Sequence, residues 1–271
     1  MRSARLRGRD HAVLGAVDAL AEGPAAIALS MGGAPKAYDH TDPNEDAAAF
    51  AAGAGGWLVA VADAHLGASA SQVAIDFVLD ERAAAWLADA GPVPGRWAEQ
   101  ARAALWETHL VVRRATHQPD RQGSRTTLAL AVARPGEGRL FWACIGDSHL
   151  FRVTPNAVED LASPGRPCPP RYFLGSESLT PEDLGERVVA GSGPSAGTRA
   201  LVLATDGISE RLVGLADPAA EVAEVSAQAA SAALDLRPLE TARGLALRAN
   251  AAHRRNPSGD NVAVAVCWLE A

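Results

Sequence analysis

Aspartates stand at the ends of several short apolar segments of this sequence. Asp63 follows residues 57–62, Asp147 follows 139–145 after one glycine, Asp206 follows 200–205, Asp260 shortly precedes 262–269, and Asn44-Glu45-Asp46 precedes 47–52. Carboxylate oxygens are the ligands that hard divalent cations such as Mg²⁺ and Mn²⁺ prefer. Because loops at strand ends are held rigidly and open to solvent, these aspartates are candidates for one shared cation site.

A cluster of carboxylates needs cations, because each close pair repels by about 1–4 kcal/mol near a protein surface. Two ions roughly 3.5–4 Å apart can also activate a shared water for attack on phosphorus. The pattern is therefore compatible with hydrolysis of phosphate esters. An alternative stays open at this point, since Asp-Gly and Gly-Asp pairs are also ordinary turn residues and their spacing alone does not decide.

The segments around these aspartates predict a mixture of strands and helices. Short apolar or β-branched runs predict strands at 25–30, 57–62, 126–133, 139–145, 150–153, 200–204 and 262–269. Helical spacing predicts helices at 69–90, 97–115, 218–236 and 239–253. Polar residues 32–46 predict a loop, and the Pro-, Gly- and Ser-rich residues 163–197 predict an irregular excursion. Closely spaced strands favour antiparallel pairing, so we expect an α+β layered domain.

Composition excludes several other classes of protein. Hydrophobic residues make up 48% of 271 residues, enough for a sizeable core, and the net charge of -7 disfavours non-specific nucleic-acid binding. We find neither a signal peptide nor an apolar run of about 18 residues, so we expect no membrane span. The cysteines Cys144, Cys168 and Cys267 lack zinc-site spacing; Cys144 and Cys267 read as core residues, and a cytoplasmic location fits best.

Six motifs together resemble those of the metal-dependent protein phosphatases of the protein phosphatase 2C (PPM) family. Asn44-Glu45-Asp46 looks like N-[EQ]-D, residues 61–67 (VADAHLG) like VADGHGG, 123–127 (GSRTT) like GSTA, 145–149 (IGDSH) like VGDSR, 203–207 (LATDG) like L-[AC]-[ST]-D-G, and 260–262 (DNV) like DN-[IV]. They occur in the family's order, and the resemblance extends from about residue 25 to 269.

The resemblance implies a fold and a set of ligands. The fold is a four-layer α-β-β-α sandwich, with two antiparallel sheets flanked by helix pairs, in a single phosphatase-like catalytic domain over 1–271. Two or three Mn²⁺ or Mg²⁺ ions are implied, held by Asp46, Asp63, the carbonyl of Ala64, Asp147, Asp206 and Asp260. Asp63 would bridge two ions, and Asp147 would help to hold a weaker third.

The resemblance also implies supporting roles near these ligands. Asn261 would orient Asp260, and His65 would be the general acid that protonates the leaving oxygen. His65 could instead only pack or cap. Glu45 could lie on the solvated surface, and Asp46 could cap a helix formed by the Ala-rich residues after it. Asp147, Ser148 and His149 do not form a catalytic triad, because adjacent side chains on a strand face opposite ways.

The sequence departs from the family pattern at three positions. Ala64 and Leu66 replace glycines of the pattern, and Thr41 stands where many relatives carry an arginine that binds the substrate phosphate. Loss of such a cation weakens phosphate binding by about 1–3 kcal/mol. Lys36, His40 or Arg125 could substitute for it.

Three hypotheses follow from these observations. The first is an active metal-dependent serine/threonine phosphatase that uses a metal-activated water and acts on a phosphorylated protein, with a cognate serine/threonine kinase as a further partner. The second is a weak or inactive regulatory or binding module on the same fold, which the missing arginine and Ala64 favour. The third is an unrelated α+β protein whose aspartates lie in turns. The intact set of aspartates favours the first hypothesis, because buried acids without cations are costly.

Overall fold

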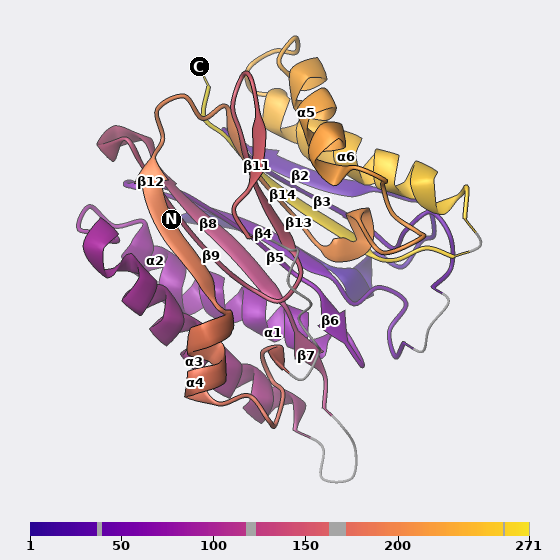
Figure 1. Ribbon diagram of the computed structural model, residues 1–271, viewed down its shortest axis with the longest axis horizontal. Helices are drawn as coiled ribbons and strands as arrows, with labels where there is room; N and C mark the ends of the chain where they lie inside the picture. Colours follow the sequence, from indigo (N-terminus) through magenta and orange to yellow (C-terminus); the bar gives the residue numbers. More distant parts are fainter. Residues whose placement is uncertain (37–39, 118–122, 163–171, 257, 271) are drawn as a thin grey trace.

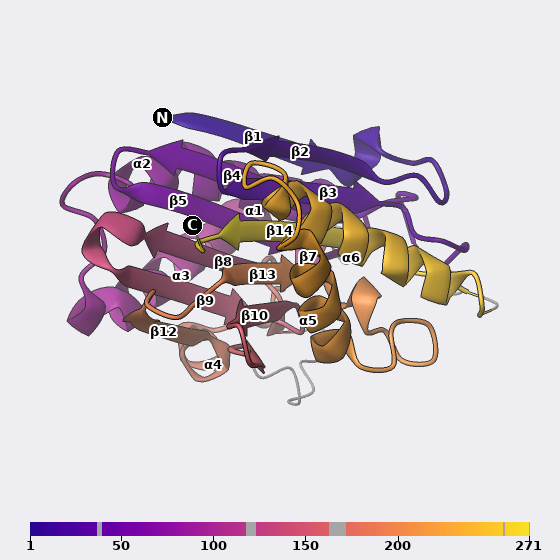
Figure 2. The same ribbon diagram turned by 90° about the horizontal axis from the view of Figure 1, so that it is seen from above.

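Two six-stranded antiparallel sheets pack face to face, and helices cover the outer face of each sheet (Figures 1 and 2). This computed structural model describes residues 1–36, 40–117, 123–162, 172–256 and 258–270. The predicted α+β architecture, a four-layer α-β-β-α sandwich, is confirmed. Among the described residues, we find no helix with the length and apolar character needed to span a membrane.

The first sheet has the strand order β1-β4-β5-β8-β9-β12, and all neighbouring pairs are antiparallel. Its strands are β1 (Arg2–Arg7), β4 (Ala47–Gly53), β5 (Gly56–Ala62), β8 (Leu128–Arg134), β9 (Arg139–Ile145) and β12 (Val189–Pro194). Strand β5 ends one residue before Asp63, and β9 ends two residues before Asp147. The first sheet therefore brings these two aspartates to one end of the sandwich.

The second sheet has the order β11-β10-β13-β14-β3-β2. Its strands are β2 (Asp18–Glu22), β3 (Ala25–Ser30), β10 (His149–Val153), β11 (Val158–Asp160), β13 (Ala200–Ala204) and β14 (Val262–Trp268). Because β13 and β14 are antiparallel partners, the end of β13 lies beside the start of β14. Asp206 and Asp260 follow and precede these two ends, so they meet at the same edge.

Both faces of the central strands are buried, which explains their continuous apolar sequences. In β5, Val59 and Val61 pack between the two sheets, whereas Leu58 and Ala60 pack under the helices of the first sheet. Side chains alternate between the two faces with a period of two residues. Cys144 and Cys267 belong to the layer between the sheets, as expected for core residues, and Cys168 lies outside the described residues.

Helices form the two outer layers of the sandwich, one on each sheet. On the first sheet lie α1 (Ser69–Phe77), α2 (Ala83–Trp86), α3 (Trp97–Thr116) and α4 (Pro181–Arg187), and on the second sheet lie α5 (Pro218–Ala229) and α6 (Arg237–His253) (Figure 1). The helix predicted over 69–90 is confirmed from Ser69 to Trp86, with a π-helical turn at Val78–Arg82 inside it, and it ends four residues earlier than predicted. The buried guanidinium of Arg134 donates to the carbonyls of Trp86, Ala88 and Asp89, which takes up the last carbonyl groups.

Three further expectations need correction. The predicted irregular excursion contains α4, which begins with a capping box between Thr180 and Asp183, and the edge strand β12; residues 163–171 lie outside the described part. The Ala-rich residues after Asp46 form strand β4, so Asp46 is no helix cap. The N-terminal strands β1 and β2 were not predicted, because their polar residues alternate with few apolar ones at the sheet edges.

Candidate metal centre

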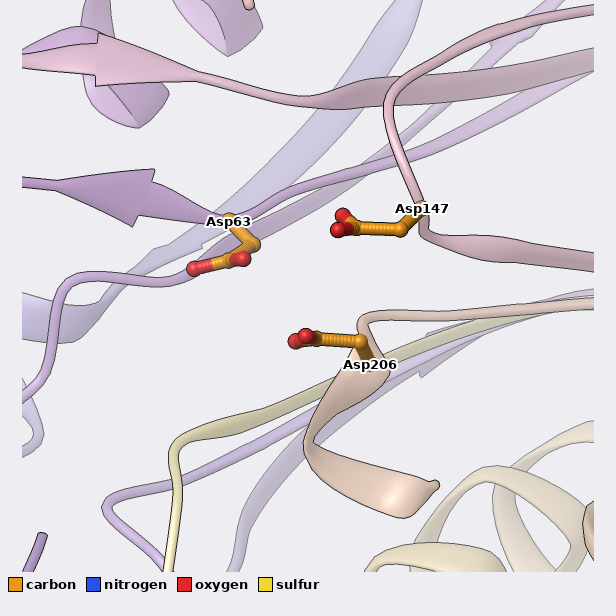
Figure 3. Close-up of side chains that lie close together, drawn as sticks. All are labelled: Asp63, Asp147 and Asp206. Carbon is orange, nitrogen blue, oxygen red and sulfur yellow. The ribbon is translucent and has the colours of Figure 1, made fainter. Parts of the chain in front are cut away.

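Three aspartates from three separate segments lie close together, with the side chains of Asp147 and Asp206 pointing toward Asp63 (Figure 3). Asp63, Asp147 and Asp206 each offer a carboxylate oxygen, and these oxygens lie within 4.8 Å of one another. Asp63 follows β5, Asp147 follows β9 and Asp206 follows β13, so both sheets contribute. This arrangement is what a divalent cation with oxygen ligands requires.

A second group of carboxylates shares Asp206 with the first. Oxygens of Asp206, Glu210 and Asp260 also lie within 4.8 Å of one another. Glu210 was missed by the sequence reasoning, although a signal existed: it stands four residues after Asp206, and residues 206–208 form a 3-10 turn. Because the chain turns directly after Asp206, an acidic residue this close in the sequence can return to the same cluster.

Asp46 reaches the same cluster through hydrogen bonds. Its Oδ2 accepts a 2.7 Å hydrogen bond from the Thr205 hydroxyl, which in turn accepts one from the backbone N–H of Ala263. The Asp46 carboxylate also lies near enough to Asp63 for its charge to raise the pKa of Asp63. Asp46 is therefore placed between the start of β4 and the end of β13, beside the aspartates from both sheets.

Hydrogen bonds to the backbone hold Asp63 in position. Its carbonyl accepts from the Thr126 hydroxyl at 2.8 Å and from the Thr127 N–H at 2.8 Å, and its own N–H donates to Thr127 Oγ1 at 3.0 Å. Gly146 adopts a φ of 104° against Thr127, where a Cβ would lie 2.5 Å from a Thr127 methyl. Only glycine fits there, so the loop carrying Asp147 can approach Asp63.

Asn261 ties the early acidic motif to the last strand. Its side chain accepts from the Glu45 N–H at 2.8 Å and donates to the carbonyls of Met31 and Pro43. Its backbone N–H donates to Asp260 Oδ1 at 2.8 Å. Glu45 is 1% exposed and accepts from three backbone N–H groups, so the alternative that it lies on the solvated surface is wrong.

The two unusual residues of the loop after Asp63 behave differently. Ala64 lies in the short extended strand β6 (Ala64–His65), and its side chain packs with Ala70, Ala74 and Val112, so a Cβ is accommodated. Leu66 has a φ of 65° in the left-handed region and is exposed. That backbone conformation costs a leucine about 1–2 kcal/mol.

The clustered aspartates have raised pKa values, because burial and neighbouring carboxylates disfavour their ionised forms. Burial, and after it the charges of neighbouring carboxylates, raise the pKa of Asp63 and Asp206 well above the usual value. Burial likewise raises the pKa of Asp46 to about 7 and that of Asp147 to about 6. Asp147 Oδ1 is buried and accepts no hydrogen bond within the part of the chain that the structure describes. The residues thus fit a divalent cation, which would satisfy this oxygen and remove the repulsion.

His65 lies at the rim of the centre, on β6. Its ring stacks on Phe173 with centroids 5.3 Å apart, and it is partly buried. Burial is the largest influence on its pKa, which is lowered, and the charges of Lys36 and Arg125 lower it further against an opposing effect of Asp260. The imidazole is therefore neutral at pH 7 until a negatively charged group comes close.

The three candidate cations occupy different places. Lys36 Nζ lies 3.5 Å from Glu45 and 3.4 Å from Asp260, inside the acidic cluster. Arg125 lies on β7 (Arg125–Thr126) directly opposite His65, so the two side chains share a face. Within the described ranges, Arg125 makes no ion pair and its Nε has no hydrogen-bond partner. His40 is exposed, and Thr41 lies at the rim, where its N–H donates to Glu45.

His149 forms a hydrogen-bonded chain that the sequence did not reveal. Its Nδ1 lies 2.8 Å from Asp160 Oδ2 and its Nε2 lies 2.7 Å from Ser209 Oγ. The Ser209 hydroxyl also lies 3.2 Å from the carbonyl of Asp206. Ser148 instead contacts Thr127, so Asp147, Ser148 and His149 form no triad, as expected. These hydrogen bonds fix the position of the 3-10 turn that begins with Asp206.

Two antiparallel sheets with carboxylates converging at one end are the arrangement that a metal-dependent phosphoester hydrolase needs. Residues 35–238 match the family model of Protein phosphatase 2C, which is more than half of the chain. The chain therefore belongs to the protein phosphatase 2C family, and it is a metal-dependent phosphoric monoester hydrolase of the serine/threonine phosphatase type.

Solved structures share the fold at low sequence identity. An arginine-substituted variant of a bacterial serine phosphatase matches with a TM-score of 0.67 at 18% identity, covering 93% of this chain and 100% of that one. A serine-threonine phosphatase 2C from Toxoplasma gondii has a TM-score of 0.65 at 17% identity, covering 95% and 100%. A serine/threonine phosphatase from Staphylococcus aureus has 0.63 at 17%, covering 92% and 96%. A search of curated proteins finds no match.

Proposed function

We propose that this chain removes phosphate from phosphoserine or phosphothreonine of a protein, using Mn²⁺ or Mg²⁺ held by its clustered carboxylates. The observation that carries the proposal is the convergence of Asp63, Asp147 and Asp206 from both sheets within 4.8 Å. Oxygen-only ligands favour these two hard cations over softer metals such as Cu or Zn. Residues 1–271 would act as one catalytic domain.

The proposed ligand roles follow from where each carboxylate lies. Asp63 lies near enough to Asp46 for the two charges to interact, and its carboxylate lies close to those of Asp206 and Asp147, which suits a ligand shared between ions. Asp260, Asp206 and Asp46 would hold ions directly or through water, and the carbonyl of Ala64 would add a ligand beside Asp63. Asp147 and Glu210 would complete the outer side of the cluster.

The remaining residues would handle the substrate. When bound, the ions supply a water of lowered pKa and neutralise charge on the phosphoryl oxygens. His65 would take up a proton as the phosphate dianion approaches, because that charge opposes the effect of burial on its pKa. It would then donate this proton to the serine or threonine oxygen, since an alkoxide is a poor leaving group.

Arg125 is our candidate for the phosphate-binding cation absent at Thr41. It lies on the same face of the β6–β7 pair as His65, burial lowers its pKa, and it forms no ion pair within the part of the chain that the structure describes. A half-buried guanidinium of this kind favours an anion such as phosphate. Lys36 is less suited, because its ammonium already contacts Glu45 and Asp260.

The experiment that tests the function is hydrolysis of p-nitrophenyl phosphate and of a phosphothreonine peptide, with chelator and with added Mn²⁺ or Mg²⁺. We expect turnover only with added cations and its loss in Asp63→Asn. Cation-independent turnover, or normal turnover of the variant, would refute the mechanism. Cation binding without turnover would favour the second candidate, a weak or inactive phosphatase-fold module, which the uncharged Thr41 supports. A phosphoprotein substrate, a cognate serine/threonine kinase and a cytoplasmic location remain parts of this proposal.

A further inference from the structure

The chain contains a single lysine, Lys36, and this lysine lies inside the carboxylate cluster. The other basic residues among the 25 Lys and Arg side chains are arginines. The Lys36 side chain is 2% exposed, although lysine side chains are rarely buried unless they are paired. The sequence therefore places its one lysine ammonium group beside the carboxylates of Glu45 and Asp260.

Contacts of both side chain and backbone fix the position of Lys36. Its Nζ lies 3.4 Å from Asp260 Oδ1 and 3.5 Å from Glu45 Oε2. Its backbone forms a parallel bridge with Gly259, whose N–H donates to the Pro35 carbonyl at 2.9 Å. A Cβ on Gly259 would lie 2.3 Å from the carbonyl oxygen of Ala34, so only glycine allows this approach. The close approach of Gly259 to residues 34–36 therefore keeps Lys36 beside the carboxylate of Asp260.

The chemistry of the two basic side chains explains why lysine is used here. An ammonium is a compact point charge, whereas a guanidinium is a planar fork that needs coplanar acceptors. A site lined by carboxylate oxygens from several directions suits the compact charge, as it would suit a metal ion. Asp46 and Asp63 are also near enough to act on the Lys36 charge, together with Asp260 and Glu45.

The cluster consequently has two unlike sides. On one side, Lys36 contacts Glu45 and Asp260, and Asp46 receives a hydrogen bond from Thr205. On the other side, Asp147, Asp206 and Glu210 contact no basic side chain by ion pairing among the residues described, and Asp147 Oδ1 is unpartnered. On the first side, Lys36 supplies positive charge to the carboxylates. On the second side, a cation from solution would have to supply it.

We propose that Lys36 is a resident cation of this centre: it takes one cation position on the Glu45–Asp260 side and leaves the Asp147–Asp206–Glu210 side to exchangeable divalent ions. The proposal rests on the metal centre proposed above and deepens it. It implies that the chain binds fewer or weaker divalent ions than its carboxylates would hold without the lysine. The number of bound ions is thereby set by a residue of the protein itself.

The test is Mn²⁺ binding to metal-free protein, measured by titration calorimetry and by electron paramagnetic resonance of free Mn²⁺. The variants are Lys36→Met, which removes the charge at similar length, and Arg125→Met, which removes a nearby positive charge that contacts no carboxylate of the cluster. We expect Lys36→Met to bind one more Mn²⁺ per chain, or to bind its weakest ion about 10-fold more tightly or better, the scale of one unit charge at this range. We expect Arg125→Met to bind the same number of Mn²⁺ ions as the wild type, with the same affinity.

Other outcomes would overturn the proposal. Unchanged or weaker Mn²⁺ binding by Lys36→Met would refute the resident-cation role while leaving the metal centre intact. An unchanged ion count with a raised KM for the phosphopeptide would make Lys36 a phosphate-binding residue instead. Absence of Mn²⁺ binding by all three proteins would reject the metal centre itself, and the proposal with it.

A measurement on the unaltered protein covers the case in which Lys36→Met fails to fold. Protein labelled with ¹³C-lysine gives one Cε–Hε signal, because it has one lysine. At saturating Mg²⁺ we expect this signal to remain that of an immobilised side chain, with two distinct ε protons. Conversion to the averaged signal of a mobile, solvated lysine would show that a divalent ion displaces the ammonium, and would overturn the proposal.

Discussion

The Thr205 hydroxyl joins two carboxylate-bearing segments that lie 159 residues apart, by donating a 2.7 Å hydrogen bond to Asp46. Its direction is fixed, because Thr205 Oγ1 accepts from the N–H of Ala263 at 2.9 Å and its proton is left for Asp46. Thr205 is fully buried, so it cannot exchange this partner for water. One neutral side chain thus aligns the carboxylates contributed by the two sheets.

Thr205→Val should loosen this alignment while keeping the shape of the side chain. We expect a loss of about 1–3 kcal/mol in the free energy of unfolding, because a buried carboxylate oxygen loses its donor. We also expect Mn²⁺ affinity to fall about 10-fold or more, as for other residues that orient ligands. Chemical denaturation and Mn²⁺ titration measure the two effects. Thr205→Ser keeps the hydroxyl and should stay near wild type; an equal loss in Thr205→Ser would point to packing instead.

Asp206→Asn should show that repulsion among the clustered carboxylates destabilises the metal-free protein, whereas the same carboxylates are needed for cation binding and turnover. In metal-free protein the amide relieves repulsion with Asp260 and Asp147, so thermal stability should rise. Added Mn²⁺ should then give little or no further stabilisation, and phosphatase turnover should be lost. Differential scanning calorimetry with and without Mn²⁺ shows both effects. Asp89→Asn, on the surface, is the control and should respond to Mn²⁺ like the wild type.

The sequence predicted that aspartates would come together at one end of the strands, because each stands next to a strand that its own residues specify. Glu210 was not predicted, although it stands only four residues after Asp206, because its direction depends on the 3-10 turn that begins at Asp206. The sequence indicated Lys36 as a candidate for binding the substrate phosphate. It did not indicate that the Lys36 side chain is buried, because that burial depends on a backbone bridge to Gly259, more than 200 residues away. The Ala-rich run after Asp46 left helix and strand both open, since alanine favours helices and only pairing with β1 and β5 makes it a strand.

Arg125→Met should weaken substrate binding more than it affects the ions. We expect KM for a phosphothreonine peptide to rise about 10-fold, corresponding to the loss of one charge-assisted hydrogen bond. Mn²⁺ affinity should stay unchanged, because Arg125 pairs with no carboxylate in the described ranges. Steady-state kinetics at saturating Mn²⁺ measure the change. Arg113→Met, on the exposed surface of α3, serves as the matched control; an unchanged KM in Arg125→Met would exclude the proposed phosphate contact.

Metal-free protein should lose stability as the pH rises through the range in which Asp147 ionises. Burial raises the pKa of Asp147 to about 6 in the folded chain, above its ordinary value of 3.8. A carboxyl whose folded pKa is raised contributes stability that is full below the unfolded pKa and lost as the pH passes the folded pKa. The wild type should therefore lose about 1–3 kcal/mol relative to Asp147→Asn between pH 4 and pH 8. Urea denaturation in chelator at several pH values tests this; a constant difference would contradict it.

Leu66→Gly should stabilise the protein at a position beside the candidate centre. Leu66 has a φ of 65°, which costs a leucine about 1–2 kcal/mol, whereas glycine adopts it freely but loses about 0.5–1 kcal/mol of chain entropy on folding. The net gain should be about 0.5–1 kcal/mol in the free energy of unfolding. Leu66→Ala keeps the Cβ and should bring no such gain, so it separates backbone strain from loss of the exposed side chain. Denaturant unfolding of the three proteins decides the matter, and a gain in Leu66→Ala equal to that in Leu66→Gly would show that the backbone is not the cause.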